Sequence, residues 1–142
     1  MQPRVHALSI SERKGTQKHN VPIAEFMVDH GIVGDAHAGP WHRQVSLLAR
    51  ESIAKMTAKG AKVGPGAFAE NITTEFLDVP NLHIGDRLII GEVELEITQI
   101  GKECHERCAI YQQVGDCVMP REGVFARVIK GGRIQVGDEI KK

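Results

Sequence analysis

A regular two-residue alternation in the second half of the chain restricts the fold more than any other sequence feature. Val93 to Ile100 reads VELEITQI, in which apolar and polar residues take turns. This pattern is typical of a β-strand that buries one face. Arg87 to Ile90 precedes it across Gly91-Glu92, and this spacing predicts a tight β-hairpin.

The remaining segments predict more short strands and one helix. Val124 to Ile129 and Arg133 to Val136 are expected to form a second hairpin. The helix is expected over Arg50 to Lys59, ended by Gly60, which tolerates the positive φ of a helix terminus. Further strands are predicted at Val5 to Ile10, Val21 to Val28, Gln44 to Leu48 and, at a sheet edge, Asn71 to Thr74. The sequence therefore predicts a mainly β fold, a small closed or partly open β-barrel, antiparallel or mixed, with a few short helices.

Length and charge limit the classes of function. The 142 residues suit a single domain, 1–142. Lys and Arg number 18, as do Asp and Glu, so the basic excess of a nucleic-acid binder is missing. No run is long and apolar enough to predict a signal peptide or a membrane span. An odd count of three cysteines argues for a reducing compartment, so a cytoplasmic location is expected. No membrane partner is expected, because no span is predicted.

An apolar-Gly-Asp triplet occurs four times, ending at Asp35, Asp86, Asp116 and Asp138. The copies at Asp86 and Asp138 run straight into apolar segments. Turn chemistry explains this pattern, because glycine takes conformations that other residues avoid and aspartate caps nearby amides. The first copy, in contrast, opens a segment rich in polar residues.

That segment, GDAHAGPWHRQVSLL, combines hydrogen-bonding side chains with kinked backbone positions. A guanidinium fork on Arg43 and backbone amides freed by glycine and proline could hold an anion. A solvated loop whose Asp35 and His37 bond their own backbone is the alternative. Further along, Glu70 and Asn71 could either line a pocket rim or cap a turn, and spacing alone does not decide between the two.

All three cysteines, Cys104, Cys108 and Cys117, lie between Gly101 and Gly123. A structural zinc site is not expected, because its ligands usually form two close pairs and only Cys104 and Cys108 are close. A disulfide is disfavoured by the expected compartment. Burial as a small apolar side chain suits Cys117 but not Cys104, which has cationic neighbours that favour a thiolate. Cys104 is therefore the candidate reactive thiol.

Four spaced segments together resemble the MOSC domain family, whose members are related to the C-terminal domain of molybdenum cofactor sulfurase. They are GDAHAG with RQVSLL, AENI, IGDRLIIG with LEITQIGKEC, and MPREGVFARVIKGGRIQVGDEI. The chain resembles the short stand-alone prokaryotic members. The resemblance implies a β-barrel similar to the small barrel domain of pyruvate kinase.

The resemblance also implies a function linked to the molybdenum cofactor (molybdopterin). Cys104 would be the catalytic residue and would carry sulfur as a persulfide, as in a sulfurtransferase, or would bind molybdenum directly. Partners would be a sulfur-donor protein and a molybdenum-cofactor protein, and the family is also associated with pyridoxal phosphate. A non-catalytic barrel that binds an anion or cofactor is the alternative. The implied cofactor-binding residues are Gly34, Asp35, His37, Arg43, Gln44, Glu70, Asn71, Arg121, Glu122, Gly123 and Arg127.

Overall fold

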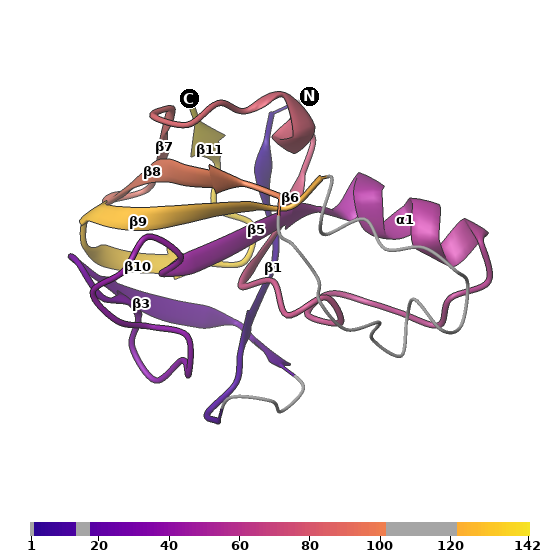
Figure 1. The fold of residues 1–142 in the computed structure, drawn as a ribbon, viewed down its shortest axis with the longest axis horizontal. Coiled ribbons are helices and arrows are strands. Elements are labelled where there is room, and N and C mark those ends of the chain that lie inside the picture. Colours follow the sequence, from indigo (N-terminus) through magenta and orange to yellow (C-terminus); the bar gives the residue numbers. More distant parts are fainter. Residues whose placement is uncertain (1, 14–17, 102–121) are drawn as a thin grey trace.

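Two β-sheets enclose the core of the protein, whose computed structural model describes residues 2–13, 18–101 and 122–142. The larger sheet of the described part runs in the order β11-β7-β8-β9-β5-β6-β1-β2, and the smaller runs β10-β3-β4 (Figure 1). The strands are β1 (Arg4–Ile10), β2 (His19–Val21), β3 (Ile23–Met27), β4 (Gly31–Ile32), β5 (Val45–Ala49), β6 (Ile72–Glu75), β7 (Arg87–Ile90), β8 (Val93–Ile100), β9 (Val124–Lys130), β10 (Gly132–Gln135) and β11 (Ile140–Lys141).

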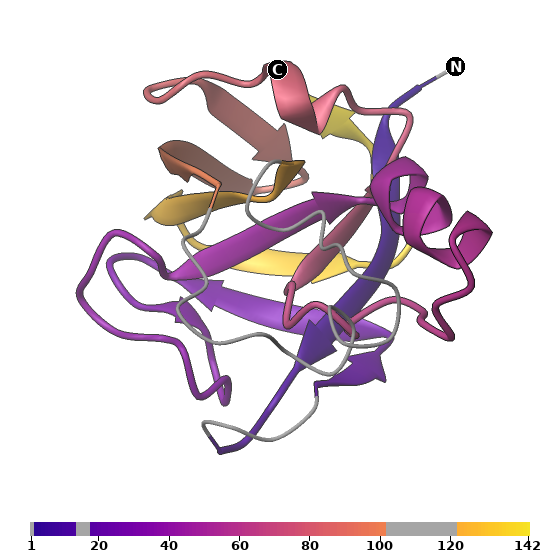
Figure 2. The same cartoon turned by 45° about the vertical axis from the view of Figure 1, so that its right-hand side comes forward.

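The architecture is a partly open β-barrel, as the sequence predicts. The larger sheet is mixed, because β5 and β6 run parallel while its other paired strands are antiparallel. An isolated bridge between Arg4 and Glu139 brings β1 beside the chain that leads into β11. That bridge does not extend into a continuous ladder, so the barrel is not closed. Figure 2, turned by 45°, shows the same strands curving around the interior.

The main core lies inside the barrel. Its side chains come from both sheets, for example Leu8, Phe26, Leu47, Leu95 and Ile134, all at most 2% exposed. The alternation in β8 has the expected consequence, since Val93, Leu95 and Ile97 are buried and the residues between them are not. This alternation fixes which face of β8 points inward.

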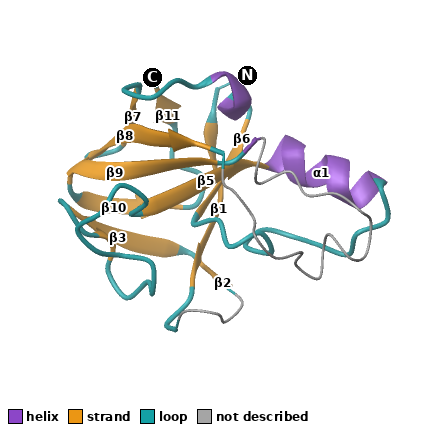
Figure 3. Cartoon of the chain, viewed as in Figure 1, coloured by secondary structure: helices purple, strands orange, loops and turns teal. Residues whose placement is uncertain are grey.

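The helix α1 (Arg50–Ala58) lies outside the barrel (Figure 3). Ile53 and Met56 are buried in a second, smaller apolar cluster that includes Phe68 and Phe125. The helix ends as predicted, because Gly60 follows it with a φ of 99°. A short 3₁₀ turn, η1 (Val79–Asn81), lies between β6 and β7.

Three strand predictions need correction. β10 pairs with β3, so β9 and β10 do not form the predicted hairpin. β6 lies between β5 and β1 in the sheet interior, where both faces are buried, and not at an edge. The stretch expected as one strand from Val21 to Val28 is divided at Pro22 between β2 and β3, which belong to different sheets. Proline lacks the N–H that a continuous ladder needs.

Candidate functional site

A small cavity of about 90 Å³ lies between the loop that precedes β5, the loop that precedes β6, and β9. A water molecule needs about 10–15 Å³ of such space, so the cavity has room for several waters or one small oxyanion. No carboxylate belongs to its described walls. These are His37, Trp41, Arg43, Ser46, Phe68, Ala69, Asn71 and Phe125.

Arg43 is the cationic group of this cavity. Its guanidinium carbon lies 4.8 Å from the centre of the Trp41 ring and 5.3 Å from that of Phe125, so two aromatic faces flank the charge. Trp41 is itself held in place, because its indole N–H donates to the carbonyl of His37 at 2.8 Å. Within the described residues, Arg43 forms no hydrogen bond or ion pair. The charge is thus oriented but not neutralised.

A buried ion pair supports the loop that carries His37. Lys18 Nζ lies 2.8 Å from Asp35 Oδ1, and the two side chains are 1% and 0% exposed. The same carboxylate accepts from the backbone N–H of Ser11 at 3.0 Å and of His37 at 3.3 Å. Lys18 also donates to His37 Nδ1 at 3.1 Å. The buried carboxylate of Asp35 and the buried ammonium of Lys18 therefore hold this loop in place.

Asn71 joins three segments at the cavity. Its Oδ1 accepts from the backbone N–H of Ser46 at 3.0 Å, and its Nδ2 donates to the carbonyl of Ser9 at 3.1 Å. Ser46 Oγ in turn donates to the carbonyl of Ala69 at 3.1 Å. Asn71 lines the cavity, but these protein partners occupy its polar atoms. The role of Asn71 is therefore structural, because its hydrogen bonds hold the walls of the cavity together.

Glu70 organises the loop between α1 and β6 and is fully buried. Its carboxylate accepts from the N–H groups of Gly66 and Phe68 and from the hydroxyl of Thr73, at 2.9–3.1 Å. Burial raises the pKa of the Glu70 carboxyl above its ordinary value, while these hydrogen bonds oppose that rise. The loop it holds includes Ala69, whose φ of 64° is uncommon for a residue other than glycine.

Other predicted residues lie further from the cavity. Gln44 is buried and accepts from the N–H of Val128 at 2.9 Å, which links β5 to β9. Gly34 is exposed in its turn with a φ of 88°. Glu122 accepts from Ser52 Oγ at 2.6 Å and from Lys55 Nζ at 2.9 Å, so it anchors the start of β9 to α1. Gly123 accepts from the N–H of Gly101 at 2.7 Å.

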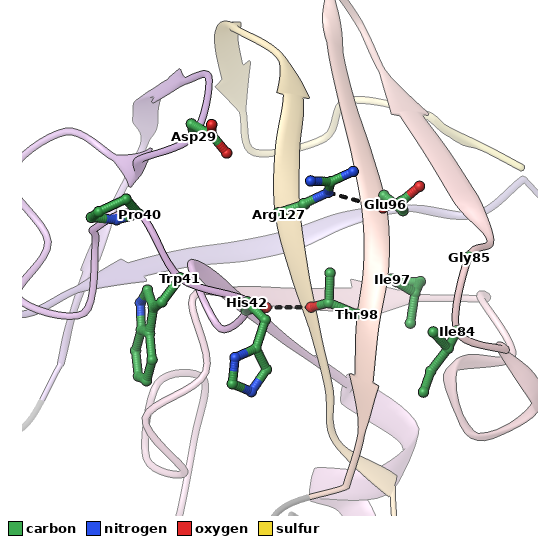
Figure 4. Close-up of a pocket in the computed structure, with 10 residues that line it drawn as sticks. All are labelled: Asp29, Pro40, Trp41, His42, Ile84, Gly85, Glu96, Ile97, Thr98 and Arg127. Carbon is green, nitrogen blue, oxygen red and sulfur yellow. Dashed lines mark hydrogen bonds and ion pairs between the residues drawn. The ribbon is translucent and has the colours of Figure 1, made fainter.

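Arg127 belongs to a second, larger cavity of about 460 Å³ on the outer face of β8 and β9. There its Nε donates to Glu96 Oε1 at 2.9 Å (Figure 4). Trp41 is the residue that lines both cavities. The structure thus places Arg43 and Arg127, both among the implied cofactor-binding residues, in two adjoining cavities.

The cysteine segment lies outside the described residues. This applies to Cys104, Cys108, Cys117 and Arg121, and their predicted roles remain predictions. On either side of this segment, Ile100 pairs with Val124 at the end of the β8–β9 ladder. Among the described residues, no three His, Cys, Asp or Glu side chains form a group that could hold a metal ion. No helix in those same ranges is long and apolar enough to cross a bilayer.

Three residues of the cavity region were not predicted from the sequence. Phe125 lies in an apolar strand, and nothing there marks it as a partner for Arg43. Lys18 lies in the polar stretch from Ser11 to Asn20, which the sequence predicts as a loop and which carries no site signal. Trp41 carries the clearest available signal, because it is the chain's only tryptophan and occurs within the polar GDAHAGPWH loop.

These features define a class of protein, a partly open β-barrel with a cationic, aromatic-walled cavity of oxyanion size. Residues 34–141 match the MOSC domain family, so the chain belongs to that family, which is associated with molybdenum cofactor sulfurase-like function. No curated protein matches the chain significantly.

Solved structures share the fold. YuaD from Bacillus subtilis superposes with a TM-score of 0.82 at 19% identity, over 99% of this chain and 94% of that one. YiiM from Geobacillus stearothermophilus gives 0.69 at 16% identity, over 97% and 73% of the two chains. YiiM from Escherichia coli gives 0.68 at 19% identity, over 97% and 68%. At such low identities these structures support the architecture and not the chemistry of individual residues.

Proposed function

We propose that this MOSC domain binds an oxyanionic group of the molybdenum cofactor beside Arg43 and carries sulfur on Cys104. The observation that supports it most is the guanidinium held between Trp41 and Phe125 without a carboxylate partner in the described part of the chain. An Arg fork complements a phosphate by paired hydrogen bonds, and the cavity has the volume for such a group. The donor set therefore fits the terminal phosphate of molybdopterin.

The short distance along the chain from Gly101 to Cys104 is compatible with a role for Cys104 near this cavity. Cys104 follows Gly101 by three residues, a length of chain that spans at most about 11 Å. Gly101 is two residues beyond Gln99, which pairs with the cavity residue Phe125. Covalent geometry alone thus permits the thiol to reach the cavity.

Sulfur loading requires no further co-reactant. The Cys104 thiolate attacks the terminal sulfur of a donor persulfide, and a new S–S bond forms on Cys104. The S–S bond of the donor breaks, and the donor leaves as a thiolate with the bonding electron pair. The bound cofactor would supply the metal centre that uses sulfur. The residues of this chain bind its anionic end and present the sulfur.

Mass spectrometry after exposure to a small persulfide donor tests the sulfur-carrier role. The wild-type protein should gain one sulfur atom that a reductant removes, and Cys104→Ser should abolish this gain. Cys108→Ser and Cys117→Ser are matched controls and should retain it. A sulfur adduct that persists in Cys104→Ser, or that never forms on the wild-type protein, contradicts the proposal.

The second candidate function is a binding module without sulfur transfer. The observation in its favour is that described residues alone supply cavity walls, a cation and hydrogen-bond donors. Calorimetry with phosphate and with molybdate distinguishes the two. The same affinity in the wild type and Cys104→Ser, together with no sulfur loading, favours the binding module. Loading that depends on Cys104 favours the carrier.

A further inference from the structure

The side chains that line the Arg43 cavity can donate hydrogen bonds to a ligand, whereas their acceptor oxygens are already occupied. The guanidinium of Arg43 carries only donors, and it forms no hydrogen bond or ion pair within the described ranges. Asn71 Oδ1 accepts from the backbone N–H of Ser46 at 3.0 Å and lies 3.2 Å from Ser46 Oγ. Ser46 Oγ accepts from the backbone N–H of Asn71 at 3.1 Å and donates to the carbonyl of Ala69. These contacts engage the lone pairs of both side-chain oxygens.

The ring of His37 adds no acceptor, because Lys18 fixes which of its nitrogens carries the proton. The buried ammonium of Lys18 lies 2.8 Å from Asp35 Oδ1 and 3.4 Å from Ser11 Oγ. Its third contact is with His37 Nδ1 at 3.1 Å. An ammonium only donates, so Nδ1 must accept, and the proton of the neutral ring lies on Nε2. Lys18 is therefore a positioning residue that removes the acceptor nitrogen of His37.

The other titratable groups on the elements around the cavity do not offer an acceptor there either. The carboxylate of Glu70 accepts from amides of its own loop and from the hydroxyl of Thr73. The carboxylate of Asp35 is paired with Lys18. His42 lines the larger cavity, where its Nε2 lies 2.9 Å from Gln99 Oε1. In the part of the chain that the structure describes, no carboxylate or imidazole side chain is thus placed to take a proton or an O–H bond from a ligand beside Arg43.

We propose that this cavity selects tetrahedral oxyanions by their ionisation state and binds only those that carry no proton. A ligand with an O–H group has to donate a hydrogen bond, and an O–H enclosed here would lose its bond to water without gaining an acceptor. Sulfate, molybdate and the dianion of a phosphomonoester carry no such group. This inference rests on the proposed function, because it concerns the anion beside Arg43, and it adds the form in which that anion binds.

Calorimetry on the whole purified chain with methyl phosphate and with sulfate tests this selectivity. A phosphomonoester has a second pKa of about 6, so about a tenth of it is dianionic at about pH 5 and nearly all of it at about pH 8. Methyl phosphate should therefore bind about tenfold more weakly at the lower pH. Sulfate carries no proton at either pH, so its affinity should stay constant and controls for titration of the protein. Nitrogen NMR of the histidine rings should place the proton of His37 on Nε2.

The outcomes separate this inference from the proposed function. Equal affinity for methyl phosphate at both pH values, parallel changes for methyl phosphate and sulfate, or binding of methyl phosphate without sulfate overturns the selectivity. A proton on Nδ1 of His37 overturns it as well, because an acceptor nitrogen would then remain. Absence of binding by every oxyanion, or methyl phosphate affinity that is unchanged in Arg43→Gln, overturns the Arg43 site itself. Thermal unfolding of the wild type and of Arg43→Gln at both pH values serves as the folding control.

Discussion

The two cavities that meet at Trp41 are built from the same kinds of side chain. They differ in whether their arginine has a carboxylate partner among the described residues. Beside Arg43 the cation is stacked between rings and left without a carboxylate in the described chain. Beside Arg127 the cation is bonded to Glu96, and Asp29 adds a second acidic group. An arginine in a pocket therefore does not by itself indicate an anion site. The carboxylates around the arginine decide whether its pocket can bind an anion.

The supporting ion pairs differ as much as the cavities do. Lys18–Asp35, beneath the Arg43 cavity, is almost completely buried, whereas Arg127 and Glu96 are 46% and 21% exposed. Removing one partner of a buried pair leaves an uncompensated charge, while an exposed pair contributes little. The fold should therefore depend on the first pair far more than on the second.

The largest expected effect follows from this difference. Lys18→Met should lower the free energy of unfolding by about 3–5 kcal/mol, because it leaves the buried Asp35 carboxylate unpaired. Arg127→Met, the matched control at the exposed pair, should cost less than about 1 kcal/mol. Urea unfolding of both variants measures the contrast. Equal losses would show that the two cavities do not differ in their structural support.

The next effect concerns ligand affinity. Arg43→Gln should weaken phosphate or molybdate binding by about 10- to 100-fold, through the loss of charge-assisted hydrogen bonds. Arg133→Gln, at an exposed arginine of β10 outside both cavities, is the control and should bind as the wild type does. Calorimetry at one fixed salt concentration gives the comparison. Phosphate affinity that is the same in Arg43→Gln as in the wild type would refute the assignment of the anion to this cavity.

A pH dependence distinguishes the buried Glu70 from Glu75, which lies in the same segment. Burial raises the pKa of Glu70, so its stabilising contribution is complete below its unfolded pKa and is lost as pH rises through its folded pKa. The hydrogen bond from Arg4 lowers the pKa of Glu75, so its contribution is present above its unfolded pKa and is lost as pH falls.

Unfolding free energies measured from acidic to neutral pH test these opposite signs. As pH rises, wild type should lose stability relative to Glu70→Gln and gain stability relative to Glu75→Gln. Parallel pH profiles for the two comparisons would mean that burial does not govern the Glu70 carboxyl.

The smallest predicted effect tests strain in the wall of the Arg43 cavity. Ala69 has a φ of 64°, in the left-handed region where glycine costs less than alanine. Ala69→Gly should therefore stabilise the protein by up to about 1 kcal/mol. Ala67→Gly, without that positive φ, should destabilise it by about 0.5–1 kcal/mol. Thermal unfolding compares them, and a loss of stability in both variants would exclude strain at Ala69.

Strand alternation and turn residues were enough to predict much of the fold. β7, β8, α1 and the partly open barrel followed from local patterns, because side-chain period and glycine conformation are local properties. The pairing of β10 with β3 joins segments over 100 residues apart in the sequence, and no local pattern specifies it. For the same reason the interior position of β6 was missed.

The sequence could name candidate residues of the site, but not which of them share a cavity. Arg43 and His37 were expected near an anion and do line one cavity. The assignment of Arg127 to a different cavity depends on which face of β9 its side chain occupies and on a cross-strand contact with Glu96. Three copies of the apolar-Gly-Asp triplet illustrate the same limit. Asp35, Asp86 and Asp138 each accept from an amide of their own turn, but Asp35 also forms a buried ion pair with Lys18, which no local pattern predicts.

A crystal soaked in tungstate, a strongly scattering analogue of molybdate, tests the central claim most directly. The anomalous difference map should show a peak within hydrogen-bond distance of the Arg43 guanidinium, between Trp41 and Phe125, and none beside Arg127 and Glu96. A peak at the Arg127 side, or none beside Arg43 at saturating tungstate, would contradict the account.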